Sequence, residues 1–284
     1  MPDEAAASSP YQYITTSKVG GVVTVVLDNP PVNVMSAPLL RELRNVLLDL
    51  EKDEVTKVIV FESANPEYFI AHFDMGLVDD LAAFDDLAEL APPGLNFTQA
   101  FSEQLRRQPQ VSIVKLKGTA RGGGSEFVLA ADMCFATPDA KLSQAEILMG
   151  VIPGGGATQY LNRRIGRNRA LEAILGADLF DAQTLEKYGW INRVVAHDEI
   201  DDFVNRLAAN MANLPYGSIS AIKRAIPPAD EADGLVTENE IYFEQFARSA
   251  AGKILRGTLT AGAQTPEGER DLEGLLRAVA ARVN

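Results

Sequence analysis

KGTARGGGSEFVLAAD, residues 117–132, is the stretch that decides the fold, because it joins an apolar strand to a helix through three consecutive glycines. Glycine tolerates positive φ and leaves backbone N–H groups uncovered by side chains. The first N–H groups of a helix have no partner within it, and the helix dipole favours negative charge there. Gly122–Gly124 therefore predicts either a site for an oxyanion or phosphate, or a tight turn that packs helix and strand closely.

Strands and helices alternate on both sides of this stretch, which indicates an α/β core. Short apolar runs typical of strands buried on both faces are Val58–Phe61, Val111–Leu116 and Met133–Ala136. From about Ile200 onward the pattern is almost entirely helical. We therefore divide the chain into a flexible N-terminal arm (1–10), an α/β core (11–200) and a helical C-terminal region (201–284).

The composition excludes several classes of protein. A net charge of −13 over 284 residues disfavours nucleic-acid binding, which requires clustered basic side chains. No apolar run approaches the roughly 18 residues of a membrane span. Cys134, the single cysteine, rules out an intrachain disulfide and a cysteine-rich metal site. We expect a cytoplasmic protein without a metal.

Much of the negative charge lies in one segment, residues 74–91, which holds six acidic residues and no basic one. An anionic ligand could therefore still bind elsewhere on the chain. The spacing of the apolar residues in this segment predicts a short amphipathic helix. Its inward side chains would be Leu77, Leu81, Phe84 and Leu87.

Two glutamates follow the glycine run. Because 20 residues separate them, they can act together only if the fold brings them close. Glu126 lies in the first turn of the predicted helix, and Glu146 precedes the apolar run Ile147–Ile152. Glu126 could act on a group bound by the glycine amides, or it could simply complement the helix dipole. Glu146 could equally be a surface residue.

Five segments in this order resemble the crotonase superfamily, the enoyl-CoA hydratase/isomerase family. The resemblance extends from about Tyr13 to Ala225. The segments are DNPPVNVMS (28–36), FIAHFDM (69–75), KGTARGGGSEFVLAAD (117–132), SQAEILMGVIPGGGATQYL (143–161) and FDAQTLEKYGWINRVV (180–195). Membership would imply the crotonase-like (ClpP/crotonase) superfold, with repeated ββα units in two roughly perpendicular sheets and a helical C-terminal region.

The resemblance also implies a mechanism. The backbone N–H groups of Phe73 and Gly123 would form an oxyanion hole for a thioester oxygen, and Glu126 and Glu146 would hold a water molecule. Two carboxylates favour an enoyl-CoA hydratase, which adds water across the 2,3 double bond of fatty-acid-type substrates. Enoyl-CoA isomerisation, which typically relies on the counterpart of Glu146, and other crotonase-type reactions of acyl-CoA are the alternatives.

In the family, coenzyme A is held largely by the backbone and belongs to the substrate, so no separate cofactor is expected. The corresponding residues for CoA and acyl binding are Val32, Val34, Ile70, Ala71, His72, Asp74, Met75, Gly122, Pro153 and Gly154. The resemblance further implies a homotrimer or a dimer of trimers, with residues 201–284 packed between subunits. Ile241, Phe243 and Phe246 are candidates for such contacts, although a core position is the default for each.

Three features depart from the family pattern. Phe73 replaces a small residue, which predicts an atypical acyl group, and His72 takes a glycine position. We expect the His72 side chain to face solvent; the alternative is contact with the nucleotide or the carbonyl. Residues 74–91 lie where the family has a mobile helix. Finally, the segment LRGTLTAGAQTPEGERDLEGLL (255–276) differs from the closing helices that often supply a basic residue to CoA.

Two functions of other classes remain open. Ser125 follows the glycines as in a nucleophile elbow, but the glycine usually found two residues after the serine is Phe127 here. A serine hydrolase would also need His72 or His197 as its base. The second alternative is a non-catalytic CoA-binding protein, in which both glutamates would be inert.

Overall fold

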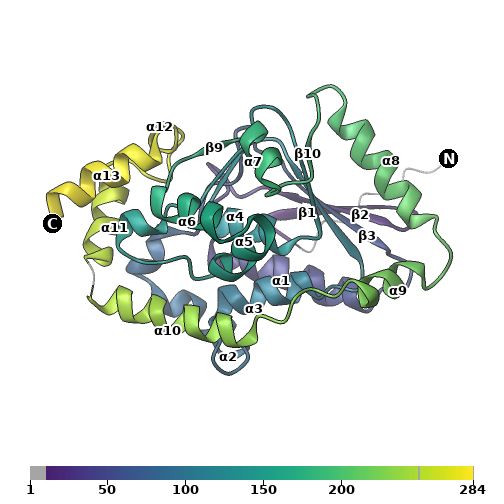
Figure 1. Cartoon of the computed structure of the whole chain (residues 1–284), viewed down its shortest axis with the longest axis horizontal. Coiled ribbons are helices and arrows are strands. Elements are labelled where there is room, and N and C mark those ends of the chain that lie inside the picture. The colour runs from purple at the N-terminus through teal and green to yellow at the C-terminus, as the bar shows by residue number, and fades with distance from the viewer. Residues whose placement is uncertain (1–10, 249, 284) are drawn as a thin grey trace.

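The structure of this chain is a computed structural model that describes residues 11–248 and 250–283 (Figure 1). The N-terminal arm predicted for residues 1–10 lies outside the described residues.

Two sheets form the centre of the molecule. The larger has the order β1-β2-β3-β5-β7-β10, and only the β1–β2 hairpin is antiparallel in it. Its strands are β1 (Ile14–Val19), β2 (Val22–Leu27), β3 (Val58–Ser63), β5 (Val111–Leu116), β7 (Met133–Ala136) and β10 (Arg193–Val194). The smaller sheet has the order β4-β6-β8-β9, with β9 antiparallel to β8. Its strands are β4 (Tyr68–Ile70), β6 (Thr119–Arg121), β8 (Lys141–Ser143) and β9 (Phe180–Asp181).

The chain passes from the larger sheet to the smaller one three times. β3 leads to β4, β5 to β6 and β7 to β8, and helical segments follow each pair before the chain returns. Because β4, β6 and β8 pair side by side and in parallel, their carboxyl ends lie at the same edge of the smaller sheet. The predicted repeat of ββα units and the α/β fold class are confirmed.

Helices surround both sheets (Figure 1). The α-helices before residue 200 are α1 (Ala37–Glu51), α2 (Asp85–Glu89), α3 (Phe97–Arg106), α4 (Gly123–Ala130), α5 (Ala157–Ile165), α6 (Arg167–Gly176) and α7 (Ala182–Tyr188). Those that follow are α8 (Ile200–Ala212), α9 (Ser218–Ala225), α10 (Ala232–Arg248), α11 (Ala251–Thr260), α12 (Pro266–Glu269) and α13 (Leu272–Val283). Three short 3₁₀ helices are η1 (Met75–Val78), η2 (Leu81–Phe84) and η3 (Glu146–Met149).

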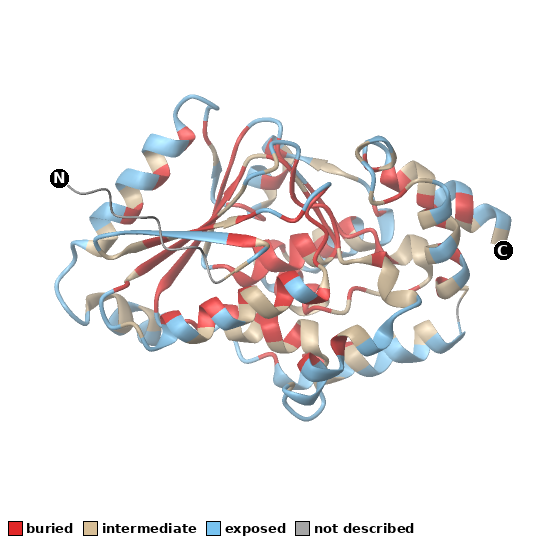
Figure 2. Ribbon diagram, turned by 180° about the vertical axis from the view of Figure 1, so that it is seen from behind, coloured by how far each residue is buried: buried red, intermediate tan, exposed pale blue. Residues whose placement is uncertain are grey.

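The larger sheet is covered on both faces, and its buried residues run along the strands at the centre of the molecule (Figure 2). One face joins the main core, which includes the apolar side of α1 and nearly all of α4. The other face places Val58, Val60 and Ile113 against Ile200 and Val204 of α8. Burial on both faces explains why these parallel strands read as continuous apolar runs.

Packing continues across residue 200, where the sequence pattern changes. α8 covers the larger sheet, and Leu235 of α10 enters the main core. α11 and α13 form a third apolar cluster in which Ile254, Leu272 and Leu276 meet Met75 and Ala145. The C-terminal helices therefore pack on the core of their own chain and reach the segments around the glycine run.

The prediction of one amphipathic helix in the acidic segment is wrong in part. The chain forms η1, η2 and α2 there; Asp79 and Asp80 separate η1 from η2, and η2 continues directly into α2 as the helix type changes. Phe84 and Leu87 are buried as expected, but Leu81 is 61% exposed. Short helical turns do not keep one continuous 3.6-residue period, so the apolar spacing did not place every side chain on the same face.

No helix in the described part of the chain has the length and apolar character needed to cross a bilayer.

The first prediction concerns the approach of α4 to β4. A Cβ on Gly124 would stand 2.3 Å from the carbonyl oxygen of Ile70, closer than any packed structure allows. We expect Gly124→Ala to lower the free energy of unfolding by about 2 kcal/mol or more, because backbone must move to admit the methyl group. Urea denaturation measures this change.

The control is Gly252→Ala in α11, where the nearest neighbour of an added Cβ is the mobile end of Arg256 at 3.4 Å. This substitution should raise the free energy of unfolding by up to about 1 kcal/mol through helix propensity. A Gly124→Ala protein as stable as the wild type would contradict the close approach.

Candidate active site

The glycine run brings two loops together at the edge of the smaller sheet. Gly122 has φ +47°, a conformation that favours glycine, and its N–H donates to the carbonyl of Ser143. α4 begins immediately afterwards at Gly123. A Cβ on Gly123 would lie 3.3 Å from the Phe73 Cβ and 3.7 Å from the Phe73 nitrogen. The start of α4 thus faces the loop that follows β4.

Neither predicted oxyanion-hole amide has a hydrogen-bond partner among the described residues. In the bridge between Met35 and Phe73, the N–H of Met35 donates to the His72 carbonyl, and the N–H of Asp74 donates to the Met35 carbonyl. This pattern leaves the Phe73 N–H unused. The Gly123 N–H is the first of α4 and has no acceptor inside the helix. Two neighbouring donors are therefore available to an oxyanion.

Glu126 points from the first turn of α4 toward the start of α5, and its side chain is buried. Its Oε1 accepts hydrogen bonds from the N–H groups of Gly155 (2.7 Å) and Ala157 (3.2 Å). Gly155 fits beside this carboxylate only because it lacks a side chain, since a Cβ there would lie 2.3 Å from Oε2. The absence of a side chain at Gly155 therefore makes room for Glu126.

Glu146 is the first residue of η3 and is also buried, so it is not a surface residue. Its Oε1 would lie 2.8 Å from a Cβ on Gly122, which places the carboxylate beside the first glycine run. With its nitrogen turned toward Glu146, the Gln144 amide donates to both carboxylate oxygens at 3.1 Å. In that orientation the Gln144 oxygen accepts from the Ser125 hydroxyl, also at 3.1 Å.

The two carboxylates interact electrically, although 20 residues separate them in the sequence. Burial, followed by the charges of Glu146 and Glu238, raises the pKa of Glu126 well above its ordinary value. Burial raises the pKa of Glu146 to about 7, with a further contribution from Glu238. Since neither group ionises easily in the presence of the other, the pair retains a proton near neutral pH. It can therefore supply an acid and a base together.

Glu238 of α10 is a third buried carboxylate that the sequence analysis did not identify. It accepts from the N–H groups of Gly156 (2.7 Å) and Thr158 (3.0 Å) and from Gln99 Nε2 (3.0 Å). These bonds cap the start of α5, and burial raises the pKa of Glu238. Nothing in the sequence marks Glu238, because its partners are backbone groups more than 75 residues away.

Aromatic residues form the apolar wall of the site. The Phe73 ring lies 5.3 Å from that of Phe84 and 5.9 Å from that of Phe97, measured between centroids. On the opposite side, Tyr242 of α10 packs on Gly154, where an added Cβ would be 2.9 Å from its ring. Burial, followed by the charges of Glu126 and Glu146, raises the pKa of Tyr242 to about 12. Tyr242 therefore keeps its proton beside the carboxylates.

These groups line one cavity of roughly 180 Å³. Its lining includes Phe73, Gly123, Glu126 and Glu146, together with side chains from α10, α11 and α13. Phe243 and Phe246, which the sequence suggested as subunit contacts or core, line it as well. Their α10 pattern gives no indication of this position, because only tertiary packing lays α10 across the site.

The residues predicted to bind CoA and the acyl group fall into two sets. His72, Asp74, Met75, Gly122 and Gly154 line the cavity. Val32, Val34 and Ala71 are buried with Tyr68 in a small apolar cluster, and Ile70 and Pro153 are buried behind the cavity wall. Asp74 holds the loop through its Oδ1, which accepts from Gly76 N–H (2.8 Å) and Gln264 Nε2 (3.0 Å). Their roles in CoA binding stay predictions.

The expectation that His72 faces solvent is wrong. Its side chain is buried, with Nδ1 2.7 Å from the Phe73 carbonyl oxygen and Nε2 2.9 Å from Glu269 Oε1. Glu269 belongs to the C-terminal segment that departs from the family pattern, so this partner was not foreseeable. The arrangement also removes His72 as a base for Ser125, which is fully buried, and His197 pairs with Asp139 instead.

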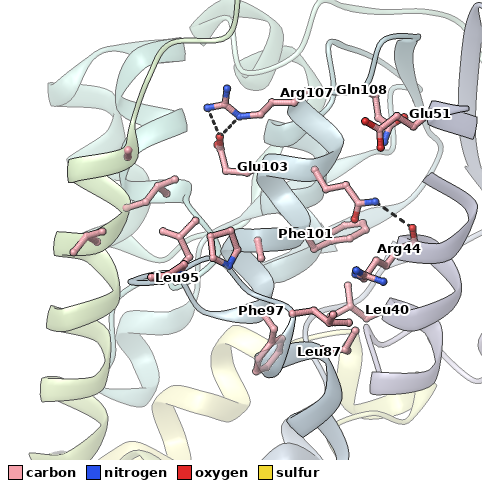
Figure 3. Close-up of a pocket in the computed structure, with 18 residues that line it drawn as sticks. Leu40, Arg44, Glu51, Leu87, Leu95, Phe97, Phe101, Glu103, Arg107 and Gln108 are labelled. Carbon is pink, nitrogen blue, oxygen red and sulfur yellow. Dashed lines mark hydrogen bonds and ion pairs between the residues drawn. The ribbon is translucent and has the colours of Figure 1, made fainter. Parts of the chain in front are cut away.

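A second cavity of roughly 530 Å³ lies between α1, α3 and α10 (Figure 3). Polar side chains in it pair with nearby groups. Figure 3 shows Arg107 beside Glu103, and the Gln104 amide donates to the backbone carbonyl of Arg44. Phe97 borders both cavities. The larger volume holds neither the free amides nor the coupled carboxylates, so we place the active site in the smaller cavity.

The chain is similar to several known proteins. Residues 17–253 match the family model described as enoyl-CoA hydratase/isomerase. A solved structure named a putative enoyl-CoA hydratase from Streptomyces avermitilis is 54% identical and covers 95% of this chain and 99% of its own, with a TM-score of 0.94. A probable enoyl-CoA hydratase of Rhizobium meliloti is 28% identical over 248 residues, which is 84% of this chain and 91% of the relative. The structure of an enoyl-CoA hydratase from Bacillus anthracis is 26% identical, covers 88% of this chain and 95% of its own, and has a TM-score of 0.70.

The burial of Glu146 predicts a pH-dependent effect on stability. Because the folded-state pKa, about 7, exceeds the ordinary value of 4.5, the stabilisation from its bound proton is complete below about pH 4.5. That stabilisation is lost as the pH rises through 7. Glu146→Gln should therefore gain free energy of unfolding relative to the wild type between pH 5 and pH 8.5, by an amount on the order of 3 kcal/mol.

Denaturant titrations at the two pH values measure this difference. Glu186→Gln, on the exposed side of α7, is the control and should show no comparable gain because its side chain stays in water. An equal difference at both pH values for Glu146→Gln would contradict the raised pKa.

Proposed function

Because the chain belongs to the enoyl-CoA hydratase/isomerase family, we propose that it is an enoyl-CoA hydratase whose reaction takes place in the smaller cavity. One observation carries the proposal: two unpaired amides, of Phe73 and Gly123, and two buried carboxylates, Glu126 and Glu146, line the same cavity. This combination suits an acyl thioester, whose oxygen gains negative charge when its β-carbon is attacked.

The proposed reaction uses each group once. The thioester oxygen accepts hydrogen bonds from the Phe73 and Gly123 N–H groups. One carboxylate of the pair takes a proton from a water molecule while the water oxygen bonds to the β-carbon. The electrons of the double bond move to the thioester oxygen and form an enolate. The protonated carboxylic acid of the pair then gives its proton to the α-carbon.

The amides favour the transition state over the substrate, because the charge on the oxygen is largest in the enolate. Loss of one such donor costs about 10²–10³ in rate in enzymes where it has been removed. The raised pKa values suit the pair to its task, since one shared proton provides the acid and leaves the base free. Tyr242, which stays protonated, lines the cavity near the two carboxylates.

The aromatic lining of the cavity suits an acyl chain. Phe73, Phe97, Phe243 and Phe246 line the cavity, and their side chains offer no hydrogen-bonding group. The assembly as a homotrimer or a dimer of trimers, and the cytoplasmic location, stay predictions from the family resemblance.

The main test replaces each carboxylate by its amide. Glu126→Gln and Glu146→Gln should each lower the rate of hydration of a short enoyl-CoA by roughly 10³-fold or more, because each removes a proton-transfer group. Loss of the enoyl absorbance measures the rate, and circular dichroism checks the fold. Glu186→Gln serves again as the control with unchanged activity.

The wild-type protein should first be assayed with a panel of enoyl-CoA thioesters by absorbance and by mass. A gain of the mass of water indicates hydration, whereas movement of the double bond without a mass change would indicate isomerisation instead. Full activity in either glutamine variant would refute the proposed mechanism. Stoichiometric labelling of Ser125 by a fluorophosphonate would support a hydrolase.

A second test concerns chain length. Phe73→Ala keeps the backbone N–H but removes the ring that packs on Phe84 and Phe97. We expect the ratio of kcat/KM for a long enoyl-CoA to that for a short one to rise by about tenfold or more. Phe203→Ala on α8 removes an equal volume outside the cavity lining and should leave this ratio unchanged. A Phe73→Ala ratio equal to that of the wild type would show that the ring does not limit the acyl chain.

A further inference from the structure

A buried cluster of four charged side chains lies behind the two oxyanion-hole amides. Its members are His72, Arg121, Glu269 and Glu273, and none of them is more than 7% exposed. His72 precedes Phe73 in the loop after β4, Arg121 ends β6 just before Gly122 and Gly123, and Glu269 and Glu273 come from α12 and α13. Both carboxylates of the cluster therefore come from the C-terminal segment.

Glu269 contacts both chain segments that lead to the two amides. Its Oε1 lies 2.9 Å from His72 Nε2, and its Oε2 lies 3.3 Å from Arg121 Nη1. Its backbone carbonyl also accepts from Arg121 Nη2 at 2.9 Å. His72 immediately precedes Phe73, and Arg121 lies two residues before Gly123. One fully buried residue thus connects the chain segments that carry the two amides.

The sheet alone does not provide this connection. β4 and β6 pair in parallel only as far as Ile70 and Ala120, with a register irregularity between Tyr68 and Ile70. Beyond that point β4 has ended, whereas β6 continues to Arg121, which pairs with Ser143 of β8. The relative position of the Phe73 and Gly123 N–H groups therefore depends on further contacts as well as on the sheet.

A neighbouring residue strengthens the hold on the first loop. Gln264 Oε1 accepts from the Met75 N–H at 2.8 Å, and Gln264 Nε2 donates to Asp74 Oδ1 at 3.0 Å. The Gln264 N–H in turn donates to Glu269 Oε1 at 2.9 Å. The loop is therefore fixed on either side of Phe73, through His72 before it and through Asp74 and Met75 after it.

The Glu269 carboxylate is stabilised by its partners. Both ring nitrogens of His72 face oxygen atoms, those of the Phe73 carbonyl and the Glu269 carboxylate. Burial acts to raise the pKa of Glu269, but the His72 hydrogen bond and charge outweigh it and leave that pKa lowered. Removal of one partner would therefore leave a buried charge uncompensated.

Glu273 extends the cluster to the third segment of the site. Its Oε1 accepts from Arg121 Nε and from the Ser143 hydroxyl, both at 2.9 Å. The Ser143 carbonyl accepts from the Gly122 N–H at 3.0 Å, and Glu146 follows three residues later. The cluster therefore also contacts the segment that leads to Glu146.

We propose that Glu269 is a positioning residue of the oxyanion hole, which fixes the Phe73 and Gly123 amides relative to each other by binding His72 and Arg121. This role rests on the proposed function, because the hydratase reaction is what brings a thioester oxygen to the two amides. A displacement of about 1 Å between catalytic groups can cost about 10²-fold in rate.

The main variant is Glu269→Gln, which keeps the size of the side chain and removes its charge. We expect kcat for enoyl-CoA hydration to fall by about 10- to 100-fold. The dissociation constant of a saturated, unreactive acyl-CoA should change by less than about threefold, because ground-state binding depends little on the hole. Glu267→Gln, an exposed carboxylate on the same short helix, should leave both values unchanged.

A spectroscopic measurement follows the hole directly. The infrared stretch of an isotope-labelled thioester carbonyl should move to lower frequency when the saturated acyl-CoA binds the wild type, because two donors polarise it. Glu269→Gln should show a smaller shift. A general loss of stability would not by itself change this frequency in the fraction that binds.

His72→Gln tests the same contact from its other end and replaces Glu269→Gln if that variant does not fold. The double variant should be no worse than the more impaired single one, because both substitutions break one interaction.

The outcomes separate the two proposals. An unchanged carbonyl shift and unchanged kcat in Glu269→Gln, or in His72→Gln where only that variant folds, would overturn the positioning role and leave the hydratase proposal standing. A wild type that binds acyl-CoA and polarises its carbonyl but hydrates none of the panel would overturn the hydratase reaction, while the shift in the variants would still decide the role of Glu269. A wild type that binds no acyl-CoA would overturn both.

Discussion

The close approach between Gly122–Gly124 and the loop Ile70–Phe73 is the constraint on which the site depends. Backbone of α4 meets backbone of β4 with no room for a side chain, as the position of Gly124 against Ile70 shows. Because both segments end strands of the same parallel sheet, their free N–H groups come close together. A side chain on Gly124 would push these segments apart, and one on Gly122 would collide with Glu146.

The buried carboxylates near Gly122–Gly124 lower the stability of the fold, and the proposed reaction uses two of them. Burying Glu126, Glu146 and Glu238 disfavours their ionisation, as their raised pKa values show. Backbone N–H groups of Gly155 and Gly156, just before α5, offset part of this cost for Glu126 and Glu238. Strongly shifted pKa values of this kind are concentrated at functional sites.

The C-terminal third of the chain completes the cavity from outside the α/β core. α10 lays Tyr242, Phe243 and Phe246 over the carboxylates, and α12 and α13 bring Glu269 and Glu273 to the charged cluster. The C-terminal helices thus supply part of the apolar lining and contact the segments that carry His72 and Arg121, whereas Glu126 and Glu146 come from the α/β core.

The sequence by itself determined the fold class and the strand-to-helix turn at Gly122, because these depend on local periodicity and on the conformational freedom of glycine. It also singled out Glu126 and Glu146 as candidate site residues, through motifs that occur in a fixed order. Only the tertiary structure decided that Glu146 is buried, that Leu81 is exposed, and that His72 binds Glu269 rather than facing water. It also placed Tyr242 at the cavity and Glu238 at the start of α5. The physical reason is that charge pairing and burial between residues more than 100 positions apart leave no periodic trace in the chain, whereas a helix or a strand does.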